Sequence, residues 1–200
     1  MMHIRQLKSY GDNFSYLIVD PATEKALVID PFYEITPILE AARSLNGEIQ
    51  WILNTHGHSD HTAGNLRLKN QTGAQIMMHA ADAVNRSDID EMIEDEPVFE
   101  LGKLKIQIIH TPGHTPGGIC LYAENNLFTG DTLFVGDSGR TDLPGGDRPT
   151  LGASIRKLMK LNEQTIVWPG HDYGPMPHST LAWEKRHNVN AREYGFYTGK

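Results

Sequence analysis

The chain has 200 residues, of which 39% are hydrophobic and 22% charged, the composition of a folded domain with a real core. A formal net charge of −7 argues against a nucleic-acid partner, because binding to phosphates requires a cationic face. No apolar run approaches the length of a membrane span and the N-terminus lacks the pattern of a signal peptide, so we expect a cytoplasmic protein with no membrane partner. The single cysteine, Cys120, lies in an apolar run and is expected to be a buried thiol.

The first half of the chain alternates strand and helix patterns. Short runs rich in Ile, Leu, Val and Tyr predict strands at 3–7, 15–19, 25–29, 51–53 and 75–78. Apolar residues at helical spacing predict helices at 36–45 and 62–71. The acidic segment 82–96 has weak patterning, which indicates a surface connection or a short helix.

The second half repeats this order of elements without repeating the residues. Strands are predicted at 104–109, 118–123, 127–128 and 165–168. Helices are predicted at 151–161 and 180–191. Alternating strands and helices predict an α/β fold, most simply two sheets layered between helices.

The densest group of metal-binding side chains is the sequence His-Gly-His-Ser-Asp-His at 56–61, directly after a predicted strand. Further candidates lie in glycine-rich turns, at His114, Asp131 and His171. Imidazole and carboxylate are ligands for divalent metals, and five histidines with two aspartates are about the number that two ions need if each keeps an open position. The pattern therefore predicts a catalytic site with two metal ions.

The spacing within the cluster suggests how the ligands divide. His56 and His58 flank a glycine, which suits an extended loop around a metal better than a helix face. We assign one ion to His56, His58 and His114. We assign the other ion to Asp60, His61 and His171, with Asp131 as the bridge.

Two ions about 3.5–4 Å apart can share a water whose pKa falls towards neutrality, which yields a hydroxide nucleophile. Asp60 is a candidate for orienting that nucleophile. The expected cofactors are two divalent ions, with zinc as the first choice and iron or manganese as alternatives, because sites of His and Asp accept all three.

These seven residues, in this order, resemble the metallo-β-lactamase superfamily over almost the whole chain. The resemblance implies an αββα four-layer sandwich, one domain over residues 1–200, and metals at the sheet edge. True metallo-β-lactamases use a cysteine in the second site, and Cys120 stands in a different context. The turns at 112–117 and 130–134 are most similar to glyoxalase II-type hydrolases, and the run 139–147 resembles the short single-domain members of that group.

This resemblance implies hydrolysis of a thioester such as an acylglutathione by a metal-bridging hydroxide. Full-length glyoxalase II has a C-terminal helical domain that holds glutathione, whereas this chain ends soon after His171. That pocket is not carried over, so the small-molecule substrate could be another thiol conjugate. The oligomeric state, monomer or homodimer, stays open.

Two alternative activities come from the same fold. The sequences at 139–142 and 171–173 also resemble persulfide dioxygenases, in which one iron would lie on His56, His114 and Asp131. Lactone hydrolysis uses the same seven-ligand plan and is a further alternative.

Two residues are candidates for substrate binding. The guanidinium of Arg140 suits an anionic group on the substrate, or it pairs with Asp142 or Asp137 in its own loop. Tyr173 either contacts the substrate or caps the last loop.

Overall fold

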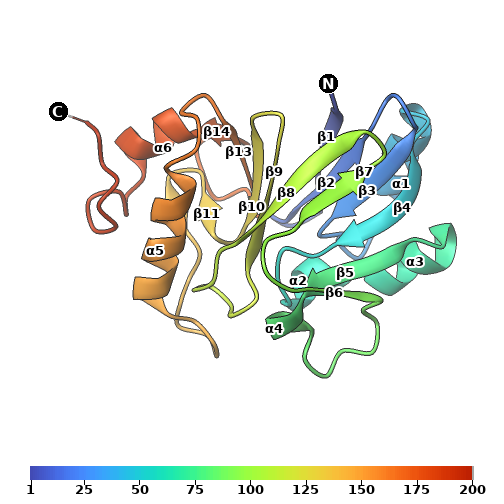
Figure 1. The fold of residues 1–200 in the computed structure, drawn as a ribbon, viewed down its shortest axis with the longest axis horizontal. Helices are drawn as coiled ribbons and strands as arrows, with labels where there is room; N and C mark the ends of the chain where they lie inside the picture. The colour runs from blue at the N-terminus through green and yellow to red at the C-terminus, as the bar shows by residue number, and fades with distance from the viewer. Residues whose placement is uncertain (200) are drawn as a thin grey trace.

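Two mixed sheets pack face to face between two layers of helices in a computed structural model, which describes residues 1–199 (Figure 1). The first sheet runs in the order β1 (His3–Lys8), β2 (Phe14–Val19), β3 (Lys25–Ile29), β4 (Glu48–Leu53), β5 (Gln75–His79) and β6 (Glu91–Ile93). The second runs in the order β14 (Ser179–Thr180), β13 (Ile166–Pro169), β10 (Asn126–Gly130), β9 (Ile119–Ala123), β8 (Leu104–His110) and β7 (Val98–Leu101). A small hairpin of β11 (Leu133–Phe134) and β12 (Asp137–Ser138) lies beside the second sheet.

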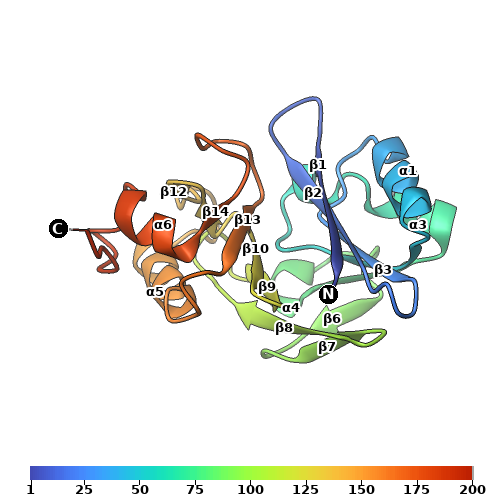
Figure 2. The same ribbon diagram turned by 90° about the horizontal axis from the view of Figure 1, so that it is seen from above.

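Each sheet carries helices on its outer face, as the view from above shows (Figure 2). The first sheet is covered by α1 (Thr36–Ser44) and α3 (Asn65–Thr72), and the second by α5 (Arg148–Leu158) and α6 (Leu181–His187). Two single-turn helices, α2 (Ser59–Thr62) and α4 (Ala80–Ala83), follow β4 and β5. The predicted αββα four-layer sandwich is therefore confirmed.

The core has three layers because the strands bury both faces. In β2, Tyr16 and Ile18 point into the cluster between the two sheets, while Leu17 and Val19 point into the cluster under α1 and α3. This alternation follows from the two-residue period of a strand. A third cluster joins the second sheet to α5, α6 and the C-terminal segment.

The predicted helix over 62–71 is wrong at its start, because the helical backbone is interrupted between α2, which ends at Thr62, and α3, which begins at Asn65. The Gly64 backbone N–H donates to the carbonyl of Pro31 at 2.8 Å, and a Cβ at Gly64 would lie 2.4 Å from the carbonyl oxygen of Phe32. Only a glycine fits this close approach.

Other boundaries also differ from the prediction. The segment expected to be a connection or short helix contains α4 and the edge strand β6. The predicted closing helix over 180–191 ends at His187, since Asn188 is extended. No helix within residues 1–199 is both long and apolar enough to cross a membrane.

The topology gathers the carboxyl ends of several strands at one edge of the sandwich. β3, β4 and β5 run parallel in the first sheet, and β10 runs parallel to β13 in the second. Loops that follow parallel strands meet at the same edge, where α/β folds place their sites. A bridge between Asn13 and His171 also joins the first sheet to the second at this edge.

Candidate metal centre

The seven candidate ligands come from both sheets. The loop after β4 carries His56 and His58, and the following turn of α2 carries Asp60 and His61. The second sheet contributes the other three, from the loops after β8, β10 and β13, namely His114, Asp131 and His171. Neither half of the chain contains the whole set.

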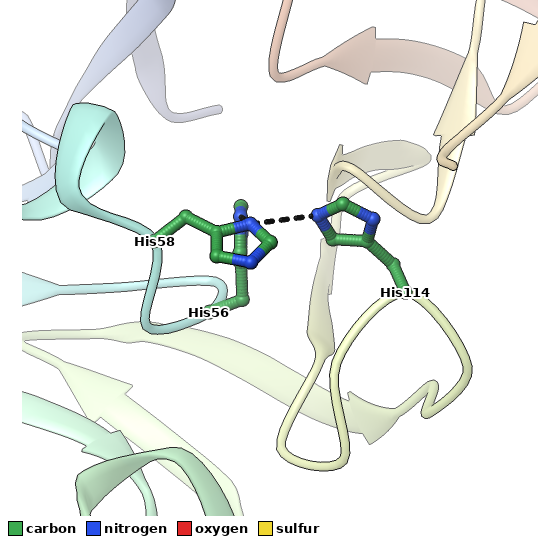
Figure 3. A group of neighbouring side chains, drawn as sticks. All are labelled: His56, His58 and His114. Atoms are coloured by element: carbon green, nitrogen blue, oxygen red, sulfur yellow. Dashed lines mark hydrogen bonds between the residues drawn. The ribbon is translucent and has the colours of Figure 1, made fainter. Parts of the chain in front are cut away.

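The first cluster consists of three histidines whose ring nitrogens converge (Figure 3). Nδ1 of His58 lies 3.0 Å from Nε2 of His56 and 3.0 Å from Nε2 of His114. His58 is the N-terminal cap residue of α2 and has extended backbone, which lets its ring turn back towards His56. The predicted grouping of these three residues is the one that the structure brings together.

The second cluster joins α2 to the loop after β13. Nε2 of His61 lies 3.1 Å from Nε2 of His171, and Oδ2 of Asp60 lies 3.5 and 3.4 Å from these two nitrogens. Asp60 and His61 occupy one helical turn, and the Asn13 side chain donates to Asp60 Oδ2 at 2.9 Å. This grouping also matches the predicted one.

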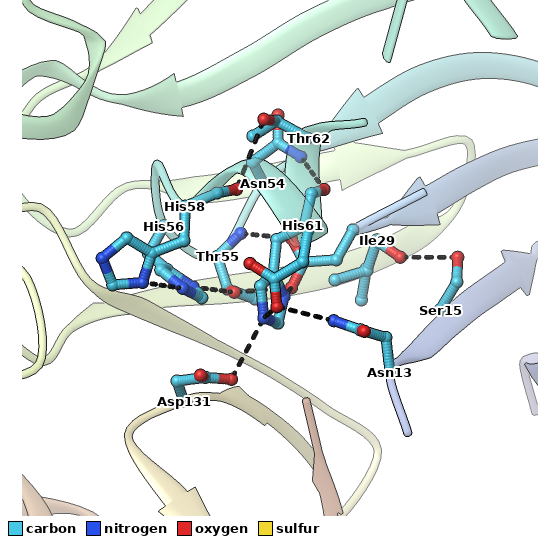
Figure 4. Close-up of polar contacts among 12 residues, drawn as sticks. Asn13, Ser15, Ile29, Asn54, Thr55, His56, His58, His61, Thr62 and Asp131 are labelled. Carbon is cyan, nitrogen blue, oxygen red and sulfur yellow. Dashed lines mark hydrogen bonds and ion pairs between the residues drawn. The ribbon is translucent and has the colours of Figure 1, made fainter. Parts of the chain in front are cut away.

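Asp131 lies between the clusters. Its Oδ2 is 3.5 Å from Nε2 of His114 in the first cluster and 3.4 Å from Nε2 of His171 in the second. Its Oδ1 is 3.3 Å from Nε2 of His61, the contact drawn in Figure 4. The side chain is nine-tenths buried, yet Oδ1 has no hydrogen-bond partner among the described residues. A buried carboxylate oxygen without a donor fits a place that a cation fills.

The outer nitrogens of the rings fix which nitrogen carries the hydrogen. Nδ1 of His61 lies 3.0 Å from Asp30 Oδ2, Nδ1 of His114 lies 2.7 Å from the Arg140 carbonyl, and Nδ1 of His171 lies 3.2 Å from Asp12 Oδ1. Carbonyls and ionised carboxylates only accept, so each Nδ1 donates, and in the neutral ring the inner Nε2 presents a lone pair. Lone pairs and carboxylates that converge in this way repel one another without a cation, so the donor set fits divalent metal ions.

Two pKa shifts in the second cluster point the same way. Burial lowers the pKa of His61, but Asp131 and Asp30 outweigh it, so the pKa of His61 stands well above its usual value. Burial likewise opposes ionisation of Asp131, but His61 and His171 hold the pKa of Asp131 well below its usual value. The site therefore demands positive charge beside Asp131, which protons or metal ions can supply.

Burial has a different result in the first cluster. Desolvation, with His61 adding to it, holds the pKa of His56 well below its usual value. Desolvation, with His114 adding to it, also lowers the pKa of His58. Neutral imidazole is the form that binds a metal.

The sequence did not single out Asp30, which supports the ligands from behind. Its carboxylate accepts the Thr55 backbone N–H at 2.7 Å and the Thr55 hydroxyl at 2.6 Å, in addition to facing His61. Asp30 also lies close enough to His56 and His61 to form a third metal-competent group. Since its oxygens already hold Thr55 and the outer nitrogen of His61, we interpret Asp30 as a support for the ligands. The only sequence signal was an aspartate at the end of a strand.

The two predicted substrate-binding residues lie at the rim. Arg140 forms a two-point ion pair with Asp142, with both contacts at 2.6 Å and both side chains more than half exposed. Its backbone carbonyl is the acceptor for His114. Tyr173 is 57% exposed, stacks on the His171 ring at 4.7 Å and meets Phe134 edge-on.

Comparison with known proteins agrees with this geometry. The sequence profile of the metallo-beta-lactamase superfamily matches residues 10–171. The chain belongs to this superfamily. A hydroxyacylglutathione hydrolase from Rhodospirillum rubrum is 41% identical over 183 residues, which are 90% of this chain and 70% of that protein. Superfamily membership and the His/Asp clusters together make the chain a metal-binding enzyme of glyoxalase II-like type.

Solved structures of the superfamily extend the comparison. The crystal structure of ETHE1 from Myxococcus xanthus has a TM-score of 0.88 and 33% identity, and the match covers 98% of this chain and 88% of that one. A crystal structure of TTHA1623 in a di-iron-bound form has a TM-score of 0.77 and 29% identity, with 94% of this chain and 98% of that one covered. Superfamily relatives of similar length therefore share the whole fold.

Proposed function

We propose that this protein is a binuclear metallohydrolase that cleaves a thioester, with a hydroxyacylglutathione as the first substrate to test. The observation that carries the proposal is the position of Asp131, whose Oδ2 lies within 3.5 Å of ring nitrogens from both clusters. The similarity to a hydroxyacylglutathione hydrolase supports the substrate class, and the di-iron form of TTHA1623 supports two ions. Two divalent ions held in this way lower the pKa of water and polarise a carbonyl group.

The chain's own residues would place the reactants. Asp60 is the most exposed of the seven ligands and is held by Asn13, so its carboxylate can orient a water at the mouth of the site. Burial opposes ionisation of Asp60, but His61 and Asn13 outweigh it, and the pKa of Asp60 is lowered. An ionised Asp60 can accept a hydrogen bond from that water at neutral pH.

The rim residues would bind the substrate. Tyr173 presents an aromatic face beside His171, and the Arg140 guanidinium lies on the loop that positions His114. Arg140 suits a carboxylate on the thiol carrier, because its planar fork pairs with carboxylates at two points. A thiolate is a good leaving group, so thioester cleavage needs no acid from the chain beyond these groups.

A second candidate is favoured by the similarity to ETHE1. A persulfide dioxygenase would hold one iron on His56, His114 and Asp131, a set of two histidines and one carboxylate that suits ferrous iron. The second cluster would then be present without a metal.

Metal content and a thioesterase assay on the same preparation separate the two candidates. We expect about two ions per chain in protein purified without added metal, with hydrolysis of the thioester. Asp131→Ala should lose one ion and at least 100-fold in turnover, the usual scale for a removed electrostatic group. Glu100→Gln, which alters an exposed carboxylate on β7, should change neither quantity. One iron per chain, with oxygen uptake on a persulfide, would favour the dioxygenase, and full activity of Asp131→Ala would refute the binuclear mechanism.

A further inference from the structure

Asp82 joins the two loops that carry the first histidine cluster. Its Oδ2 accepts the Gly57 backbone N–H at 2.9 Å, and its Oδ1 accepts the Gly117 backbone N–H at 2.6 Å. Gly57 stands between His56 and His58, and Gly117 follows His114 by three residues. A single carboxylate on α4 therefore fixes the distance between the loop after β4 and the loop after β8.

The two glycines make this close approach sterically available. A Cβ at Gly117 would lie 2.6 Å from the Asp82 backbone nitrogen and 2.7 Å from its carboxylate. A Cβ at Gly57 would lie 3.3 Å from the Asp82 carbonyl oxygen. A side chain at Gly117 would push Asp82 away, so the contact depends on the absence of that side chain.

Arg86 holds the other side of the same glycine. Its Nη1 donates to the Gly57 carbonyl at 3.3 Å, while its guanidinium pairs with Asp88 at 2.8 Å. The peptide units before and after Gly57 are thus tied to the segment 82–86. These are the units that set the directions of the His56 and His58 side chains.

We propose that Asp82 is a positioning residue that sets the metal affinity of the His56, His58 and His114 cluster without binding the ion. This inference rests on the proposed metal centre and assigns one cluster its support. Hydrogen bonds from backbone N–H groups to an ionised carboxylate are short and strong, so they hold the two ligand loops at a fixed separation. The second cluster has separate supports in Asp30, Asn13 and Asp12, so losing Asp82 should leave its affinity unchanged.

The test is a titration of Asp82→Asn with Co²⁺ against a chromophoric chelator. An amide has one acceptor oxygen and turns an NH₂ group towards the second glycine N–H, so one of the two contacts is lost. We expect about a 10- to 100-fold weaker affinity for one ion and an unchanged affinity for the other, the usual effect of removing a group that orients a ligand. The two clusters differ in their donors, so the absorption of bound Co²⁺ identifies which one has changed.

Asp90→Asn is the matched control. Asp90 also accepts a backbone N–H, from Ile76 at 2.8 Å, and pairs with Lys69, but it contacts neither ligand loop. It should alter neither metal affinity. Equal affinities in Asp82→Asn and the wild type, or equal weakening of both ions, would overturn the inference.

A second variant keeps the test decisive if Asp82→Asn does not fold, as judged by circular dichroism. Arg86→Ala removes the contact to the Gly57 carbonyl, together with the Asp88 ion pair and a 3.5 Å contact to the Thr62 hydroxyl. It leaves the Asp82 carboxylate in place and should weaken the same ion by several-fold, whereas an unchanged affinity would overturn the role of this segment. The result is separable from the proposed reaction. If the wild type binds one ion or leaves thioesters intact, the proposed function fails, while the affinity of the first cluster remains measurable.

Discussion

The carboxylate of Asp30 lies 3.0 Å from Nδ1 of His61, on the opposite side of the ring from Asp131, which lies 3.3 Å from Nε2. The imidazole is thus held between two carboxylates, one buried behind it and one in the metal centre. Because Asp30 accepts the Nδ1 hydrogen, it directs the lone pair of Nε2 into the site.

We therefore expect Asp30→Asn to weaken metal binding by about 10- to 100-fold, the scale known for groups behind a metal ligand. The variant should also lose roughly 1–3 kcal/mol of unfolding free energy, because a buried acceptor is replaced in part by a donor. Asp20→Asn is the matched control, since Asp20 is also buried and accepts the Lys103 N–H at 2.8 Å and the Thr23 hydroxyl at 2.7 Å. Competition with a chelator should show normal metal affinity in that control. A normal metal affinity in Asp30→Asn would show that Asp30 does not support the metal centre.

Removing the metal should destabilise the folded protein. Bound ligand at 100 times its dissociation constant stabilises the native state by about 2.7 kcal/mol, and for a chain of this size that corresponds to roughly 5–10 °C in Tm. Thermal denaturation with and without a strong chelator measures the difference. Restoring the ion should restore the Tm, and the Asp131→Ala variant should respond less to the chelator than the wild type.

The Arg140–Asp142 pair predicts opposite effects from its two members. Arg140→Ala should raise the KM for an anionic substrate, and Asp142→Asn should lower it by freeing the guanidinium. Each change should be no more than about fivefold, because an exposed ion pair is screened by solvent and contributes little. A neutral thioester is the control and should show no change in KM. Equal effects of Arg140→Ala on the KM of both substrates would show that Arg140 does not bind the anionic group and only pairs within its own loop.

The pH dependence of this pair follows from the pKa of Asp142. The hydrogen bonds from Arg140 lower that pKa to about 2 from an ordinary value of 3.8. A carboxyl whose folded pKa is depressed keeps its pairing above the ordinary value and loses it as the pH falls through the folded value. The difference in KM between the Asp142→Asn variant and the wild type should therefore be constant from about pH 5 upwards.

Cys120 should resist thiol reagents in the native protein. The side chain is fully buried beside the Thr111 hydroxyl, and burial raises the pKa of the thiol to about 11. Because the fold favours the neutral thiol, its contribution to stability is present below pH 9 and is lost as the pH rises towards 11. We expect no labelling at pH 8 until denaturant is added, and a Cys120→Ala variant that loses less stability than the wild type between pH 9 and 11. Rapid native labelling would contradict the buried position.

The sequence predicted the layers of the fold and all seven candidate ligands, but it did not reveal the residues that support them. The candidates could be named because His56 to His61 form one dense motif and the others lie in glycine-rich turns after strands. Asp30 and Asp82 accept hydrogen bonds from loops that are 25 to 35 residues away in the sequence. Such long-range contacts leave no pattern in the local spacing of residues. The helix break at Gly64 was also missed, because its cause is the approach of Pro31 from another loop.

The division of the ligands between the two sheets gives metal binding a further meaning. Four candidate ligands precede β5 and three follow β8, so the chain can complete the centre only after its N-terminal and C-terminal halves have docked through the apolar layer between the sheets. An ion held by both halves links them across that interface and stabilises their packing. Each half alone would retain only part of the set of metal-binding side chains. The amount of bound metal therefore reports whether the two halves remain packed together. Substitutions in the central apolar layer should release the ions before the outer helices unfold.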